Sequence, residues 1–403
     1  MKVLTINTTP YGSVARIATE TAEIAEKIGI ENRLAFGYSS HPLKSKYFFY
    51  KTSNFVSAVI DMFLHRITGL MGVFSIYKTW RFIRQVEEYD PDIIHLHNLH
   101  GFINIGMITN YIRKRNKPVI WTFHDCWAFT GHCVHFDYIK CEKWKTVCYD
   151  CPLYKDFPKA YVDNSRRMYN LKKKWFCGLN DVTLVSPSEW MATKLRTSFL
   201  SEYTVKVINN GINLNVFSIH ESDFRARYHI GNKFVLLGVA FGWGPKKGLD
   251  VFIELARRLC DEYQIVLVGT NAESDKQLPP EIISIHTTQN QQELSDIYCA
   301  ADLFVNLTRE DTFPTVNIEA IACGTPVVTF KTGGSPEIID DTCGLVVEQD
   351  NIEELLEKIE YVRIYKPFSK VACRYHAEKF NKDQKFKEYI DLYQAIYNRR
   401  SVK

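Results

Sequence analysis

The chain has 403 residues, of which 46% are hydrophobic and 24% charged. This length exceeds what one ordinary core supports, and it predicts two domains of about 200 residues each. The formal net charge of +4 is too mild to indicate a nucleic-acid partner. Met1–Ile6 looks like a strand rather than the start of a secretory signal, which favours a cytoplasmic location. Eleven cysteines in such a chain indicate thiols or metal ligands rather than a disulfide framework.

The first predicted domain, residues 1–215, opens with a strand at Lys2–Asn7, a turn at Gly12 and Ser13, and a helix from about Val14 to Ile28. Strand, glycine turn and helix in that order begin a doubly wound α/β sheet. A single glycine turn is weak evidence for phosphate binding, and a plain tight turn is the alternative.

An apolar segment at Phe55–Phe74 is the one candidate for a membrane span. It contains Asp61, His65 and Arg66, and a charge at the centre of a spanning helix costs about 2.5–3.5 kcal/mol. We therefore predict an amphipathic helix. Its apolar side is expected to face the core, with contact to a lipid-linked acceptor as the alternative.

Two further strands end in histidines. Asp92–Leu96 leads to His97 and His100, with His95 inside the strand as a candidate core histidine, and Pro118–Phe123 leads to His124 and Asp125. A carboxylate partner fixes the tautomer and orientation of an imidazole, so we expect Asp125 to orient His124. A purely structural His–Asp pair is the alternative.

A cysteine-rich insertion follows at residues 131–152, and its candidate metal ligands are Cys133, Cys141, Cys148 and Cys151. The last pair has the C-x-x-C spacing of a metal knuckle, and four thiolates form a closed tetrahedral zinc site. His132 or His135 is an alternative ligand, whereas Cys126 lies outside the spacing. The prediction is a structural zinc that folds this loop, against free thiols or a labile disulfide. The basic run Lys172–Lys174 is interpreted as a solvated face, with contact to an anionic lipid or a pyrophosphate-linked acceptor as the alternative.

The second predicted domain, residues 232–375, begins with a strand at Phe234–Val239 and a glycine-rich loop that carries Lys246 and Lys247. Later an apolar run, Ala301–Leu307, leads into Asp311–Pro326, D-T-F-P-T-V-N-I-E-A-I-A-C-G-T-P. We expect a short helix here, with Thr312 as N-cap, Pro314 in the first turn and Gly324 as left-handed C-cap. A helix N-terminus at a strand end binds anions, and this edge of an open α/β sheet is where ligands bind. Asp311 and Glu319 beside it suit a hydroxyl-rich ligand, against two ordinary surface acids.

This segment resembles the donor-binding signature of the family-4 retaining glycosyltransferases, which have the two-domain GT-B fold. In that family an acidic residue and a glutamate are separated by seven residues, and A-x-A-C-G-T-P-V-V follows. Glu319 matches, as does the run Ala320–Pro326, whereas Asp311 stands where Glu is usual. Asn209–Phe217 resembles a second family turn, and Asp92–Trp127 a third segment. The resemblance implies two Rossmann-like doubly wound domains facing a cleft, with residues 376–403 crossing back onto the first domain.

The resemblance also implies roles for single residues. His124 contacts the transferred sugar near the reacting centre, Asp311 holds donor-sugar hydroxyls, and Glu319 holds the nucleotide ribose. Lys247 neutralises the donor diphosphate; Gly242 occupies the position of the family's arginine, and Lys246 is a candidate substitute as a point charge. The other candidate donor contacts are the helix start and the first glycine turn: Phe313, Pro314, Thr315, Val316, Gly12 and Ser13.

The predicted function is retaining transfer of a sugar from a nucleotide diphosphate sugar to a glycan or lipid-linked acceptor in cell-surface polysaccharide synthesis. The resemblance implies that catalysis needs no bound metal, and a peripheral contact with the inner face of the plasma membrane is expected. The enzymatic alternatives are a GT-B sugar-nucleotide epimerase and a phosphorylase. The alternative from another class is a non-enzymatic, zinc-stabilised binding protein.

Overall fold

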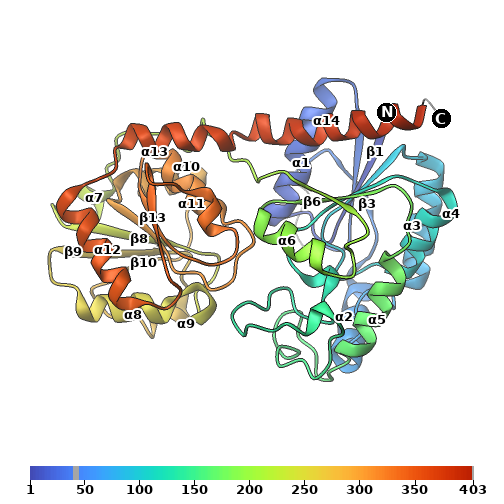
Figure 1. Cartoon of the computed structure of the whole chain (residues 1–403), viewed down its shortest axis with the longest axis horizontal. Coiled ribbons are helices and arrows are strands. Elements are labelled where there is room, and N and C mark those ends of the chain that lie inside the picture. The colour runs from blue at the N-terminus through green and yellow to red at the C-terminus, as the bar shows by residue number, and fades with distance from the viewer. Residues whose placement is uncertain (40–44, 402–403) are drawn as a thin grey trace. The chain divides into compact units, whose positions relative to one another are not determined.

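The computed structural model describes residues 1–39 and 45–401, which divide into two compact units (Figure 1). The first unit contains residues 1–209 and 385–403, and the second contains 210–384. Residues 402–403 of the predicted C-terminal segment lie outside the described part of the chain. Residues 210–215, which the sequence analysis assigned to the first domain, and residues 216–231, which lie between the two predicted domains, belong to the second unit. Ile212, Leu214 and Phe217 are buried in its core, which explains the difference.

The first unit is built on a parallel sheet in the order β3-β2-β1-β4-β5-β6-β7. The strands are β1 Lys2–Asn7, β2 Glu31–Phe36, β3 Phe48–Lys51, β4 Ile93–Leu96, β5 Val119–Thr122, β6 Val182–Ser186 and β7 Thr204–Val207. The helices between them are α1 Gly12–Lys27, α2 Phe55–Thr68, α3 Ile76–Tyr89, α4 Ile105–Arg115, α5 Ser165–Phe176 and α6 Glu189–Thr197. Central strands such as β4 and β5 are buried along their whole length, as expected for parallel strands covered on both faces.

The second unit has a parallel sheet in the order β10-β9-β8-β11-β12-β13. Its strands are β8 Phe234–Val239, β9 Tyr263–Val268, β10 Ile283–Ile285, β11 Leu303–Asn306, β12 Val327–Phe330 and β13 Gly344–Val347. The α-helices are α7 Phe224–Arg227, α8 Leu249–Arg258, α9 Ala272–Asp275, α10 Gln291–Ala300, α11 Thr315–Ala322, α12 Ile352–Tyr365 and α13 Lys370–Ala377. Both sheets reverse their strand order at an interior strand, β1 or β8, so the predicted pair of doubly wound domains is confirmed.

The last helix, α14 Lys382–Ser401, packs against the sheet of the first unit, as predicted for the C-terminal segment. The predicted start of this segment at residue 376 is too early, because residues 376–384 belong to the second unit, where Ala377 and Phe380 are part of the core. Its apolar side chains join a core cluster with β1, β4, β5 and β6; they are Phe386, Tyr389, Ile390, Leu392, Tyr393 and Ile396. A polar contact accompanies this packing, because His95 Nδ1 on β4 lies 2.6 Å from the Tyr393 hydroxyl. His95 is therefore the core histidine that the sequence analysis considered.

Helix α2 shows the opposite of the expected orientation. Its inward-facing positions include Ala58, Asp61 and His65, whereas its solvent face is apolar. The exposed side chains follow a helical stripe: Phe55, Val56, Val59, Ile60, Met62, Phe63 and Ile67. The prediction that the apolar side faces the core is wrong. The inner face lines a pocket that takes polar residues, so the stripe is left outside.

Candidate functional site

The segment after β11 places an acidic side chain beside the start of α11. Asp311 Oδ1 accepts a hydrogen bond from the Phe313 N–H at 3.3 Å. Helix α11 begins at Thr315 with Pro314 as its N-cap, so the predicted cap at Thr312 is wrong. Proline fixes φ near −65° and needs no N–H at this point, which lets the chain enter the helix two residues later than expected. The left-handed residue after the helix is Gly324, as predicted, with φ +81°.

Glu319 lies in the second half of α11 and is 5% exposed. The Tyr298 hydroxyl on α10 donates a hydrogen bond to its Oε2 at 3.2 Å. A solvated surface acid would not be buried in this way, so the structure argues against the alternative of an ordinary surface residue. The phenol also orients the carboxylate.

Lys247 lies opposite Asp311. Its Nζ is 3.0 Å from Asp311 Oδ2 and 3.3 Å from Thr308 Oγ1. The half-buried pair places one ammonium and one carboxylate at the carboxyl end of β11, close to the first N–H groups of α11. A cation and helix N–H groups that converge in this way can hold a diphosphate, and the neighbouring carboxylate can accept hydroxyl donors.

Lys246 has a different partner, which the sequence analysis missed. Its Nζ lies 3.1 Å from Glu310 Oε2, and the Glu310 side chain is only 4% exposed. The other carboxylate oxygen, Oε1, is buried without a hydrogen-bond partner in the described structure. Lys246 therefore balances a buried acid, which makes it a weaker diphosphate ligand than Lys247. Only the adjacency of Glu310 to Asp311 in sequence hinted at this arrangement.

Arg309 is the main residue that sequence reasoning overlooked. Its guanidinium forms two hydrogen bonds of 2.8 Å to the Asp250 carboxylate and one of 2.7 Å to Asp350. It also donates to the Pro245 carbonyl. These bonds, led by the pair with Asp250, raise the pKa of Arg309. The side chain is 7% exposed, so it anchors the Pro245–Asp250 loop to the end of β11 rather than reaching outward as the family's missing arginine would.

In the first unit His124 pairs with a histidine rather than with its neighbour in sequence. His124 Nε2 lies 2.9 Å from His97 Nδ1, and the two rings stack with centroids 5.2 Å apart. Asp125 instead pairs with His100, whose Nε2 is 3.0 Å from Asp125 Oδ2. The expected orienting role of Asp125 on His124 is therefore wrong. Adjacent residues at a strand end point in different directions, and only the neighbouring strand β4 decides their partners.

Burial makes these imidazoles neutral. It lowers the pKa of His95 to about 3, that of His124 to about 4, and that of His97 well below its usual range. At neutral pH, His97 and His124 therefore share one N–H between their facing nitrogens. His124 is uncharged, so it can act as a hydrogen-bonding group but not as a cation.

We expect acid to destabilise the protein through these histidines. An unfolded histidine titrates near 6.5, so between about pH 6.5 and 4 the unfolded chain binds more protons than the native one. The contribution of these histidines to the free energy of unfolding should fall as the pH falls, by about 1.4 kcal/mol per pH unit for each buried imidazole, and that contribution should be constant above about pH 6.5. Urea unfolding at a series of pH values measures this dependence of the free energy of unfolding on pH. His95→Asn should reduce the slope, and an unchanged slope in that variant would contradict the assignment.

The cysteine insertion brings together one pair of its four thiols. The Cys133 thiol hydrogen-bonds to the Cys151 sulfur, which raises the pKa of Cys133 and lowers that of Cys151. Cys148 Sγ instead accepts the Gly131 N–H at 3.1 Å. No three of the predicted ligands have sulfur atoms that all lie within 4.8 Å of one another, as judged over the described residues. All four are free thiols, so the structural zinc stays a prediction.

Lys172 lies underneath this insertion and corrects the interpretation of the basic run. It is completely buried, with Nζ 2.6 Å from the Trp127 carbonyl oxygen and 3.0 Å from that of Thr130. Its ammonium also sits 3.5 Å from the centre of the Trp127 ring. Burial lowers the pKa of Lys172 to about 7. Lys173 and Lys174 are exposed, so only two of the three form the solvated face.

Gly12 and Ser13 line a pocket of about 430 Å³ within the first unit. Gly12 has φ +87° and starts α1, so the first N–H groups of this helix lie at the pocket. Across from them, α2 contributes Asp61, His65 and Arg66, and the loop after the insertion contributes Phe157 and Pro158. This volume suits a sugar-sized ligand. The glycine turn therefore belongs to a pocket rather than to a plain connection.

Two doubly wound parallel sheets, with a cation–carboxylate pair and a buried glutamate around the helix after β11, define a protein of the GT-B glycosyltransferase class. Two family models agree: "Glycosyltransferase Family 4" matches residues 52–216, and "Glycosyl transferases group 1" matches residues 232–363. The chain belongs to the family-4 glycosyltransferases and is a glycosyltransferase with the GT-B fold.

Individual relatives are distant but cover the whole chain. The putative colanic acid biosynthesis glycosyl transferase WcaC of Escherichia coli is 22% identical over 406 residues, which is 96% of this chain and 97% of the relative. Among known structures, sucrose-phosphate synthase from Thermosynechococcus elongatus superposes with a TM-score of 0.72 at 16% identity, covering 98% and 99% of the two chains. The structure of Anabaena Alr3699/HepE in complex with UDP-glucose superposes with a TM-score of 0.65 at 15% sequence identity, and the match covers 98% of this chain and 100% of the Anabaena chain. At these identities the structures establish the fold alone.

Proposed function

We propose that this protein is a retaining glycosyltransferase that moves a sugar from a nucleotide diphosphate sugar to a glycan or lipid-linked acceptor in cell-surface polysaccharide synthesis. The observation that carries the proposal is the arrangement of Lys247, Asp311 and buried Glu319 around the start of α11. The name of the Escherichia coli relative, a colanic acid biosynthesis enzyme, supports the polysaccharide assignment. The complex of the Anabaena protein with UDP-glucose supports a nucleotide sugar donor.

In this proposal the diphosphate takes the place that Asp311 now has beside Lys247. The ammonium and the first N–H groups of α11, from Thr315 and Val316, offset the charge that develops on the leaving diphosphate. Asp311 then turns to the hydroxyls of the donor sugar, and Glu319 accepts hydrogen bonds from the ribose. None of these steps requires a bound metal.

The acceptor is assigned to the pocket beside Gly12 and Ser13, and the neutral imidazole of His124 to a hydrogen bond with the transferred sugar. The acceptor hydroxyl attacks the face that the diphosphate leaves, and the leaving phosphate takes the hydroxyl proton. The new glycosidic bond therefore keeps the anomeric configuration of the donor, which NMR of the product reads directly. Trapping a covalent sugar on any carboxylate would exclude this mechanism.

A panel of nucleotides tests the donor site. With UDP, GDP, ADP and CDP supplied in turn, we expect one base to raise the melting temperature. A ligand at a hundred times its dissociation constant stabilises the native state by about 2.7 kcal/mol. Lys247→Ala should remove the response, and Lys246→Ala should retain most of it because Lys246 balances Glu310. No response to any nucleotide would contradict the proposal.

We further propose that the protein binds the inner face of the plasma membrane through the apolar stripe of α2. The described residues contain no helix that could cross a bilayer. Every side chain of the stripe is apolar; Asp61, which lies between Phe55 and Phe63 in sequence, lines the pocket instead. The central side chains of the stripe are 51% (Ile60) and 59% (Phe63) exposed. The Ser75 hydroxyl bonds to Asp61 and so holds the start of α3 beside α2.

Helix α3 adds the features of an interfacial surface. Tyr77 and Trp80 are exposed near its start, and Arg84 lies 5.3 Å from the Trp80 ring. Amphipathic aromatics and arginines next to an apolar stripe match the boundary between headgroups and acyl chains of an anionic membrane. Because the other face of α2 lines the acceptor pocket, a docked α2 would bring that pocket to the lipid surface.

Vesicle flotation measures this contact. We expect wild-type protein to float with vesicles that contain phosphatidylglycerol and much less with neutral ones. The double change Ile60→Ser and Phe63→Ser should abolish flotation, since it places hydroxyls where acyl chains would lie. Tyr365→Ser with Tyr375→Ser is the matched control, because these side chains are 69% and 78% exposed on the second unit. Equal flotation of both double variants would exclude α2 as the docking surface.

A structural zinc held by Cys133, Cys141, Cys148 and Cys151 is also proposed, with the role of ordering residues 131–152. The contact between Cys133 and Cys151 supports it. The test is elemental analysis of wild-type protein and of Cys148→Ser, both purified without added metal. If the zinc content of Cys148→Ser were less than half an equivalent below that of the wild type, this site would be excluded.

A further inference from the structure

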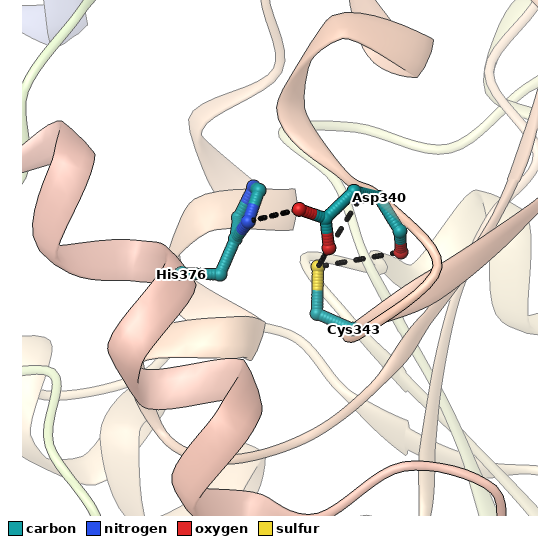
Figure 2. A group of neighbouring side chains, drawn as sticks. All are labelled: Asp340, Cys343 and His376. Atoms are coloured by element: carbon teal, nitrogen blue, oxygen red, sulfur yellow. Dashed lines mark hydrogen bonds and ion pairs between the residues drawn. The ribbon is translucent and has the colours of Figure 1, made fainter.

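A second group of potential metal ligands lies in the second unit, on segments other than those that carry Lys247, Asp311 and Glu319. Asp340 and Cys343 lie in the turn between the short 3-10 helix Ser335–Ile338 and β13, and His376 lies on α13 (Figure 2). One ligand atom from each residue lies within 4.8 Å of the other two. The Asp340 carboxylate lies between the imidazole and the thiol in Figure 2.

The separations are close to those of a tetrahedral zinc site. His376 Nδ1 is 2.8 Å from Asp340 Oδ2, and Cys343 Sγ is 3.6 Å from Asp340 Oδ1. Zinc bonds of about 2.0–2.1 Å to nitrogen or oxygen and about 2.3 Å to sulfur give ligand–ligand distances of roughly 3.3–3.6 Å in a tetrahedron. The two distances go to different oxygens of Asp340, so one of them serves as the ligand after a small rotation of the carboxylate. The carboxylate and imidazole need to part by about half an ångström, and the three ligand atoms already lie within 4.8 Å of one another.

The surroundings hold two of the three ligands in place. Cys343 is completely buried and His376 is 6% exposed. His376 Nε2 lies 2.9 Å from the Ile338 carbonyl oxygen, so an N–H on Nε2 leaves Nδ1 as the nitrogen that faces the carboxylate. A histidine ligand that donates its other N–H to a backbone carbonyl is the usual outer-shell arrangement of metal sites.

Among the described residues, Lys379 is the cation that contacts this cluster. Its Nζ lies 3.2 Å from His376 Nδ1 and 3.8 Å from Asp340 Oδ2. The side chain is 61% exposed, so the ammonium can turn into solvent when another cation arrives. Its position shows that the cluster attracts positive charge.

We propose that Asp340, Cys343 and His376 bind a zinc ion that fastens the β12–β13 connection to α13. A thiolate, an imidazole and a carboxylate form a donor set that favours zinc over magnesium or calcium, and water completes four-coordination. Binding releases the Cys343 thiol proton to solvent. The role is structural, because the three residues join the β12–β13 connection to α13 and none of them is among the proposed donor ligands.

Metal content and cobalt spectra test this site independently of sugar transfer. After loading with zinc, the Cys343→Ala and Asp340→Asn variants should each contain one equivalent of metal less than the wild-type protein. Cobalt substitution should give a thiolate-to-cobalt charge-transfer band. In Cys343→Ala the intensity of this band should fall by the contribution of one thiolate. Zinc should raise the melting temperature of the wild type more than that of either variant. Asp340→Asn guards against misfolding, because the Asp340 side chain is 39% exposed and an amide oxygen keeps the bonds from Thr342.

Cys260→Ser and Asp341→Asn are the matched controls, since they remove an exposed thiol and the neighbouring carboxylate. Both should keep the full metal content. The cysteine insertion does not confuse the result, because its metal would persist in Cys343→Ala and disappear in Cys148→Ser. Equal zinc content and equal cobalt spectra in wild type, Cys343→Ala and Asp340→Asn would overturn the proposal.

Discussion

Glu319→Ala should reduce sugar transfer to background while the protein stays folded. The substitution removes the carboxylate proposed to hold the ribose, and hydrogen bonds to a charged group contribute about 1.5–3 kcal/mol each. Two such bonds correspond to roughly a hundredfold loss or more in transfer. The stability cost should be modest, because the change leaves one buried phenol, Tyr298, without its partner. Transfer assays with the nucleotide sugar selected by the thermal panel, alongside urea unfolding, measure both effects.

Two companion variants separate binding from folding. Glu319→Gln keeps the shape and an oxygen for the Tyr298 hydroxyl, so it should keep stability and still lose much of the transfer activity. Tyr298→Phe keeps the carboxylate and should retain most activity. Wild-type transfer rates in both Glu319 variants would show that the carboxylate has no part in donor binding.

Arg309→Met should destabilise the second unit by about 1.5–3 kcal/mol, the contribution of hydrogen bonds to charged groups, because Asp250 and Asp350 are half-exposed and water can solvate them once the guanidinium is gone. The guanidinium is 7% exposed and holds Asp250 and Asp350 together with the Pro245 carbonyl. Without it, the two carboxylates repel each other and the Pro245–Asp250 loop loses its anchor. Nucleotide affinity should fall as well, because Lys247 lies on that loop. Urea unfolding and nucleotide titration measure the two effects.

Arg258→Met provides a matched comparison. Arg258 forms the same two-pronged pair, at 2.7 and 2.8 Å, with Glu353, but both residues lie at the surface. Exposed ion pairs contribute little, so stability and nucleotide binding should remain at the wild-type level. If the two variants behaved alike, Arg309 would have no special anchoring role.

Sequence alone determined the features that depend on local pattern. The succession of strand, glycine turn and helix predicted a doubly wound sheet at the start of the chain, and the length predicted two domains. The second doubly wound domain was implied by the resemblance to the family. The signature from Asp311 to Pro326 identified the family. Gly324 was assigned correctly because a helix that ends at a left-handed residue favours glycine over any other side chain.

The tertiary structure decided which groups face one another. Neighbouring residues alone did not reveal that Asp125 pairs with His100, or that Lys246 balances Glu310 while Lys247 faces Asp311. Helix periodicity shows that α2 has an apolar side, but not which side is turned to the protein, because that depends on what the rest of the unit presents to it. The burial of Lys172 likewise depends on the carbonyl groups of Trp127 and Thr130, which precede the insertion and lie more than forty residues away in sequence. Local sequence fixes backbone conformation and apolar periodicity, whereas the partner of each charge is set by contacts between segments that only folding brings together.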